Sequence, residues 1–481
     1  MFNYKKYTMK KIIKYGFLFS ISFLSLTGCS DDFLDEPVPT EAVSEDVVFG
    51  SRAGVEAFLS GINRRARQQF TNVDAAGLNS IYFARTIKGN DLIHARSWWS
   101  FDYANDNREP TYRRTNFTWE FPYYMINQAN TLINGVEASS LSEEDKAQLS
   151  GQGKAIRAFY YFQLAMEFQQ TYAFDKSLPA PPIYKELSLT GNPMSTLEEM
   201  YTLIVSDLTD AVATVGHDRL GKSYVNDNVA NGILARVYLV MGNWPGAEAA
   251  ANAAYGGNVN AVLDPASYGN GFDDINNIEW IWGNPQTSDQ SNYYYNAPSA
   301  FVDPINPAYN NIYINENFSN TFSETDARNT FIQTGSATSY LAVTSTKFVF
   351  AFDSDIVVMR TPEMILIEAE AKFRQGNIDG PDGARALLFA LQSNRDPEAV
   401  NAMNTGSALE EEILLERRKE MYGEFGVEWF DAKRLQRGIV RDPNHRIVLT
   451  LTPNDKRFFL KIPQAEIDAN DNIDASVNAN R

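Results

Sequence analysis

Cys29 is the only cysteine among the 481 residues, and this single thiol limits how the chain can be held together. One cysteine cannot form an intramolecular disulfide, and it is too few for a structural zinc site. Five lysines lie between positions 5 and 14, and an apolar run from Tyr15 to Leu26 follows them. This pattern predicts a secretory signal, because the apolar run is too short to span a bilayer as a mature helix.

The residues at positions 26–29, Leu-Thr-Gly-Cys, resemble a bacterial lipobox. In lipoproteins of that class the chain is cut before the cysteine, and both the thiol and the new amine are acylated. We therefore predict that residues 1–28 are a lipoprotein signal peptide and that Cys29 is lipidated, since several acyl chains anchor a protein stably. The alternative is an ordinary signal peptide followed by a stray cysteine. Met9 is as good a start as Met1.

The charge of the chain excludes one large class of partner. Its net charge is −18, and residues 1–28 carry five lysines and no acids, so the mature part is more acidic still. Nucleic-acid binding needs lysine and arginine to neutralise phosphates, so we expect no nucleic acid. No later apolar run approaches the roughly 20 residues of a transmembrane helix. The acidic residues 29–48, with two prolines, predict an extended tether.

Apolar residues at helical spacing predict helices along most of the chain. The first expected helices begin near Ala53, run from a cap at Ser142 to about Gln170, follow a capping box at Ser195–Glu198, and span Val229–Met241 with Asn228 as cap. Gly246–Tyr255 follows, and a later helix runs to Gln375 with Thr361 as cap and Pro362 at the first helical position. The last expected helical segments are Gly383–Ser393 and Glu410–Arg437. Short strands are expected at Glu279–Gly283 and Phe348–Phe352, with Trp280 and Trp282 in the core.

Two of the predicted helix pairs share a local pattern. Ala235 and Ala369 each lie seven residues before a Gly-Asn turn. These pairs resemble tetratricopeptide helix pairs, although the two copies are too far apart for a tandem array of ~34-residue repeats.

Aromatic residues in polar surroundings are the best candidates for ligand contacts. We interpret residues 88–115 as a long functional loop, and we predict that Trp98, Trp99, Tyr103 and Asn105 form a sugar site, because aromatic faces stack on sugar rings while amides reach hydroxyls. The alternative is that one tryptophan belongs to the core. Tyr293, Tyr294 and Tyr295 form a second candidate, because successive residues in an extended segment point to opposite faces.

Evidence for catalysis is weak. His94, His217 and His445 lie among polar residues and are expected to be exposed to solvent. The chain has no His-Glu-x-x-His, Gly-x-Ser-x-Gly or Walker motif. Asp353, Asp355 and the acidic stretch 468–474 lack the spacing of a calcium loop, so we expect no metal and no cofactor. A glycosidase needs only two carboxylates, which the sequence alone does not exclude.

Several segments together resemble the SusD/RagB family of Bacteroidota outer-membrane lipoproteins, over nearly the whole mature chain. In order they are Cys29–Asp35, Arg157–Phe162, Ser195–Tyr201, Ala235–Asn243, Arg360–Ala371, Glu416–Phe425, Trp429–Asp431 and Ile462–Ile467. The resemblance implies a mainly α fold, in which tetratricopeptide-like helix pairs form a right-handed superhelical scaffold beside a loop-rich ligand-binding half with short strands. It implies an N-terminal region at 49–260 and a C-terminal region at 261–481, with a loop-rich insert at 261–350 and helices at 360–437.

The resemblance also implies a function. Family members capture oligosaccharides, and sometimes peptides, without cutting them, and pass them to a SusC-like TonB-dependent transporter on which they sit as a lid. Asp31 and Asp32 resemble the signal that sends such lipoproteins to the cell surface, so we expect a lipid-anchored protein of the outer membrane. Arg417, Arg418 and Glu420 are expected to form structural ion pairs. The alternatives are a surface lipoprotein glycosidase and a peptide-binding tetratricopeptide-type scaffold.

Overall fold

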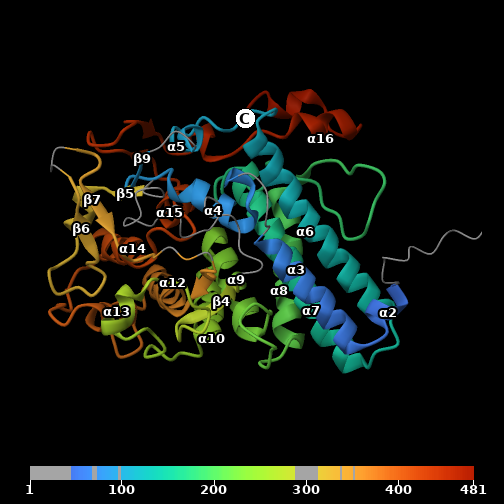
Figure 1. Cartoon of the computed structure of the whole chain (residues 1–481), viewed down its shortest axis with the longest axis horizontal. Coiled ribbons are helices and arrows are strands. Elements are labelled where there is room, and N and C mark those ends of the chain that lie inside the picture. Colours follow the sequence, from blue (N-terminus) through green and yellow to red (C-terminus); the bar gives the residue numbers. More distant parts are fainter. Residues whose placement is uncertain are drawn as a thin grey trace, which may run out of the picture. The chain divides into compact units, whose positions relative to one another are not determined.

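The structure is a computed structural model, and helices form most of it (Figure 1). It describes residues 45–67, 73–95, 99–287, 312–335, 339–349, 351 and 353–481. Residues Phe49–Arg481 form one compact unit. The predicted mainly α fold is confirmed. Within the described residues, no helix has the length and hydrophobicity needed to cross a membrane.

The helices pack mainly against their neighbours in the sequence. In chain order they are α2 (Glu45–Phe49), α3 (Arg52–Ala66), α4 (Gly77–Thr86), α5 (Ser100–Tyr103), α6 (Arg113–Ala138), α7 (Glu143–Phe168), α8 (Leu197–Thr214), α9 (Asp227–Met241), α10 (Trp244–Tyr255), α11 (Glu316–Ser319), α12 (Thr361–Arg374), α13 (Ala384–Arg395), α14 (Ser407–Met421), α15 (Val427–Arg434) and α16 (Gln464–Ala469). From α6 to α10 each helix packs against the next one in the chain. α10 then packs against α12, and α12 packs against both α13 and α14.

Both predicted helix pairs, α9 with α10 and α12 with α13, are present. α9 ends at Gly242, whose φ of 71° lies in the left-handed region that glycine adopts without strain. Gly376, with φ of 82°, adopts the same left-handed conformation just after α12. The repeated Gly-Asn pattern therefore marks two sharp turns between packed helices.

Three predicted caps are displaced by one or two residues. Thr196, not Ser195, caps α8, because its hydroxyl accepts from the N–H of Glu199 at 3.1 Å and completes a capping box with that residue. Asn226 caps α9 in place of Asn228. In the third case Thr361 is already the first helical residue of α12 and Arg360 precedes it. Ser142 caps α7 as predicted.

A four-stranded antiparallel sheet forms the main β element. Its order is β1 (Leu92–His94), β5 (Ile312–Ile314), β7 (Val343–Ser345) and β6 (Phe331–Gln333). Three antiparallel pairs lie elsewhere: β4 (Trp280–Asn284) with β8 (Ile356–Arg360), β2 (Pro179–Ala180) with β3 (Ser195–Thr196), and β9 (Ile439–Val440) with β10 (Thr450–Leu451).

Some sequence-based boundaries were wrong. The predicted loop 88–115 contains β1, α5 and the start of α6. The predicted strand 348–352 contains no strand among its described residues, and β7 and β8 lie on either side of it. The single helix predicted at 410–437 is two helices, because Gly423 and Gly426 have φ of 81° and 82° between them. Trp280 and Trp282 lie in the core, as predicted.

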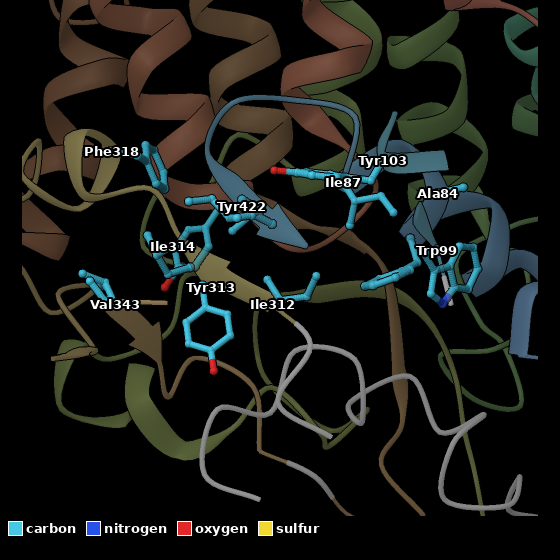
Figure 2. Close-up of a cluster of buried hydrophobic side chains, with 14 of the residues drawn as sticks. Ala84, Ile87, Trp99, Tyr103, Ile312, Tyr313, Ile314, Phe318, Val343 and Tyr422 are labelled. Carbon is cyan, nitrogen blue, oxygen red and sulfur yellow. The ribbon is translucent and has the colours of Figure 1, made fainter. Parts of the chain in front are cut away.

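One hydrophobic cluster joins the four-stranded sheet to the helices around it (Figure 2). Residues of β1 and β5 pack there with Ile87 after α4, Phe318 of α11 and Tyr422 after α14. The cluster fixes the position of the sheet relative to the helices, because such interiors are packed as densely as crystals of small molecules.

A buried ion network centres on Glu420 near the end of α14. Its carboxylate oxygens accept from three arginines, each at most 1% exposed: Arg360 at 2.9 Å, Arg395 at 3.1 Å and Arg328 at 3.2 Å. Glu279 pairs with both Arg360 and Arg395. Although burial alone raises the pKa of Glu420, the three arginines hold that pKa well below its usual value.

The predicted structural role of three α14 residues is confirmed by their contacts. Glu420 is the centre of the network just described, Arg417 pairs with Asp431, and Arg418 pairs with Asp91.

Glu420→Ala should strongly destabilise the fold. The change leaves three buried guanidinium groups without their shared carboxylate, and breaking a buried pair from one side costs about 3–5 kcal/mol. The free energy of unfolding, measured by urea titration of the chain from residue 30, should fall by that amount. Glu411→Ala is the matched control: its partner Arg437 is exposed, so the loss should stay below about 1 kcal/mol. Equal losses in the two variants would contradict this account.

Candidate functional site

The two predicted ligand segments connect to the same end of the β1–β5 strand pair, which we call the sheet edge. β1 and β5 are antiparallel, and His94 at the end of β1 pairs with Ile312 at the start of β5. The described ends of the two segments, Ala95 and Ile312, therefore lie at the same end of this strand pair. Trp98 and the three tyrosines at 293–295 lie outside the described residues.

Trp99 is placed in the core. Its side chain is 1% exposed and packs edge-on against Phe83, with ring centroids 4.9 Å apart. The guanidinium carbon of Arg114 lies 4.9 Å from the centre of its ring. A ring enclosed in this way offers no open face for a sugar, and Trp99 instead packs in the hydrophobic cluster with residues of β1 and β5.

Tyr103 is also buried, and it forms a hydrogen-bonded chain with His445. The Tyr103 hydroxyl and His445 Nδ1 are 2.6 Å apart, and His445 Nε2 lies 2.8 Å from the carbonyl oxygen of Asn90. A carbonyl only accepts, so Nε2 carries the proton and Nδ1 accepts from the tyrosine. Burial lowers the pKa of His445 to about 4, which keeps this neutral form in place at neutral pH.

Asn105 closes the turn after α5. Its φ is 60°, in the left-handed region, its side chain is buried, and its Nδ2 donates to the carbonyl oxygen of Tyr103 at 3.4 Å. The placement predicted for Trp99, Tyr103 and Asn105, in an open loop, is thus corrected. Their polar partners are inside the protein, which a stretch of mixed aromatic and polar residues does not reveal.

The histidines differ from their predicted exposure in two of three cases. His217 is exposed, with 74% of its side chain accessible, as predicted. His94 and His445 are buried, so the prediction was wrong for them. Burial and the nearby charge of Arg446 lower the pKa of His94 to about 3. Neither ring nitrogen of His94 has a hydrogen-bond partner among the described residues.

The structure also shows a hollow that the sequence analysis missed, which we name the α6 groove. It encloses about 450 Å³ between α6, the 181–194 segment that links β2 to β3, and α16. Its lining is aromatic, amide and acidic: Trp119, Glu120, Tyr123, Tyr124, Ile126, Asn127, Asn130, Tyr184, Glu186, Leu187, Ser188 and Glu466. The helical spacing of the α6 aromatic residues could be read from the sequence. That the 181–194 segment lies opposite them could not.

Acidic clusters in the described residues give no support for a metal site. No group of three or more histidine, aspartate or glutamate side chains that could hold a metal ion occurs in the described part of the chain. Asp355 has a structural role, because its two carboxylate oxygens accept from the backbone N–H groups of Ile275 and Gln286.

Comparison with known sequences identifies the family. A family profile described as starch-binding, associating with outer membrane, matches residues 32–239, and the profile of the SusD family matches residues 290–478. The chain belongs to the SusD family. No curated protein sequence matches this SusD-family chain significantly.

Solved structures show the same fold. A SusD-like carbohydrate-binding protein from Bacteroides vulgatus is 25% identical, with a TM-score of 0.81 over 88% of this chain and 98% of that one. A SusD superfamily protein from Bacteroides thetaiotaomicron is 23% identical, with a TM-score of 0.75 over 88% and 99%. Surface glycan-binding protein A from Bacteroides thetaiotaomicron, solved with laminarihexaose, is 15% identical, with a TM-score of 0.68 over 87% and 97%.

Acid should weaken the fold through His445. Its folded pKa of about 4 lies below the ordinary 6.5, so between these values the unfolded chain binds the proton and the folded chain does not. The free energy of unfolding should therefore fall as pH drops from 6.5 to 4. In urea titrations at pH 7.5 and 4.5, His445→Gln should lose about 2 kcal/mol less than the wild type. Identical losses in His445→Gln and the wild type would refute the assignment.

Proposed function

We propose that this SusD-family protein is a lipid-anchored, cell-surface glycan-binding protein that captures oligosaccharides and delivers them to a SusC-like TonB-dependent transporter. The observation that carries the proposal is the pairing of His94 with Ile312. It brings together the described ends of the two segments that carry, in sequence, Trp98 and Tyr293–Tyr295. We assign the oligosaccharide site to the sheet edge.

The buried residues beneath the edge suit a binding role. Trp99 and Tyr103 are immobilised by ring packing, by cation–π contacts and by the hydrogen bond to His445. Rigidly packed residues next to a binding site lower the ordering cost of binding. Two structural relatives also favour a sugar ligand, because one is a carbohydrate-binding protein and another is a glycan-binding protein in complex with laminarihexaose.

We propose that the bound glycan is not cleaved. A glycosidase acid has a raised pKa beside a second carboxylate. Glu428 meets both conditions, since burial and the charge of the neighbouring Asp91 carboxylate raise its pKa to about 7. However, its Oε2 accepts from the backbone N–H groups of Asn90 and Asp91, so it joins α15 to the segment before β1. This bonding gives Glu428 a structural role.

The anchoring step rests on the N-terminal sequence. We propose that the lipobox at 26–29 directs lipidation of Cys29 and that the acidic residues 29–48 serve as the tether. A protein held at the outer surface in this way is positioned to pass a captured oligosaccharide to a transporter in the same membrane.

Removing the candidate aromatic residues should weaken sugar binding. In affinity electrophoresis of the chain from residue 30 through soluble starch and laminarin, Trp98→Ala and a triple alanine variant at Tyr293–Tyr295 should each bind at least about tenfold more weakly, because each loses stacking against the sugar. Trp244→Ala is the control, since Trp244 starts α10 and its ring packs against Arg374 of α12. Undiminished binding by both site variants would exclude the edge as the site.

Cys29→Ser should release the protein from the membrane. Without the thiol no acyl chain can be attached, and the compact unit holds no described helix that could replace it. Fractionation of cells should move the variant from the outer-membrane pellet to the soluble fraction, whereas a Ser30→Ala variant should stay in the pellet. A Cys29→Ser protein that still sediments with the membrane would count against lipid anchoring.

A further inference from the structure

We infer that the α6 groove is a second saccharide subsite, specific for uncharged or amino-bearing glycans. This inference rests on the proposed glycan-binding function and extends it to a surface formed by different elements from the β1–β5 edge. The volume of about 450 Å³ lies in the range of small-molecule sites. The groove also combines the two features that a pyranose ring needs, aromatic faces and hydrogen-bonding side chains.

The aromatic wall of the groove is held rigidly. The rings of Trp119 and Tyr123 lie 5.0 Å apart on successive turns of α6, and Tyr184 meets Tyr123 edge-on at 5.9 Å. Each ring is also fixed through its polar atom. Trp119 Nε1 donates to Glu466, the Tyr123 hydroxyl donates to the carbonyl oxygen of Pro182, and the Tyr184 hydroxyl accepts from the N–H of Asn192.

Tyr124 supplies the accessible ring. It is 42% exposed, and the guanidinium carbon of Arg65 lies 4.8 Å from the ring centre. That contact orients the ring at the wall of the groove. A partly exposed tyrosine backed by a cation is suited to stacking on the apolar C–H face of a sugar.

Unused polar groups surround the aromatic wall. The side chains of Glu120, Asn127 and Glu186 line the groove and make no hydrogen bond or ion pair with another described residue. Carboxylates only accept hydrogen bonds, while the amide of Asn127 can both donate and accept. Sugar hydroxyls can supply the donors that these carboxylates need.

The charges of the groove define the glycan class. Glu120, Glu186 and Glu466 contribute three carboxylates to the lining, against the one guanidinium, that of Arg65, which packs on Tyr124. Uronic acids and sulfated sugars would be repelled, whereas neutral sugars would not be and amino sugars would be attracted. Two subsites on one chain would also let a long polysaccharide bind at both places, which raises its apparent affinity without new contacts.

The test is affinity electrophoresis of the chain from residue 30, which contains the whole compact unit, through soluble starch, laminarin, chitosan, polygalacturonate and heparin. Tyr124→Ala/Asn127→Ala should weaken retention on at least one of the first three by about tenfold. Tyr112→Ala is the matched control, because Tyr112 has a similar exposure of 40% just before α6 and lies outside the groove. It should migrate as the wild type. On the two anionic polymers the double variant should migrate as the wild type does, because the acidic groove should not bind them.

The outcomes separate this inference from the proposed function. Retention of the wild type that is lost in Trp98→Ala but equal in Tyr124→Ala/Asn127→Ala overturns the second subsite and leaves the first. No retention of the wild type on any of the five polymers overturns both. If the double variant binds every glycan as the wild type does but fails to co-purify with the transporter, the groove is a protein-docking surface and the inference is wrong.

Discussion

Glu420 holds together parts of the chain that are far apart in sequence, through a single carboxylate. The arginines that it accepts from lie in the segment before β6, at the end of β8 and at the end of α13. None of these charges is stable in a low-dielectric interior without the others. The network therefore ties the position of α14 to that of the helix pair α12–α13 and to the strand that leads into it.

The same network extends to the sheet. Lys347, just after β7, donates to the carbonyl oxygens of Glu420 and Tyr422 and pairs with Glu424, which also binds Arg360. β7 in turn pairs with β5, and β5 pairs with β1. The position of the sheet edge is thus linked, through hydrogen bonds and buried ion pairs, to helices at the other end of the sequence. A surface that holds an extended sugar chain benefits from such rigidity.

Helices were the part of this fold most accessible from the sequence, because their signals are local. The Gly-Asn turns after α9 and α12 and the cap at Ser142 could be assigned from neighbouring residues alone. The sheet could not, since its strands are three residues long and their partners are distant. The burial of His94, Tyr103 and His445 was missed for a related reason. Polar side chains look exposed in a sequence, and only the fold reveals the internal partners that make the burial of Tyr103 and His445 tolerable.

The pairing of β1 with β5 also determines how early in synthesis the chain can complete its main sheet. The two strands are separated by more than two hundred residues, and the intervening chain includes α6 to α10. Contacts between such distant segments form late and slow the overall folding rate, because the loop between them must be closed first. Because the chain is synthesised from its N-terminus, the helices α6–α10 can form early. Strand β1 has no partner until Ile312 has also been synthesised. Premature termination of synthesis would therefore yield a helical fragment with an unpaired strand edge, which is prone to aggregate.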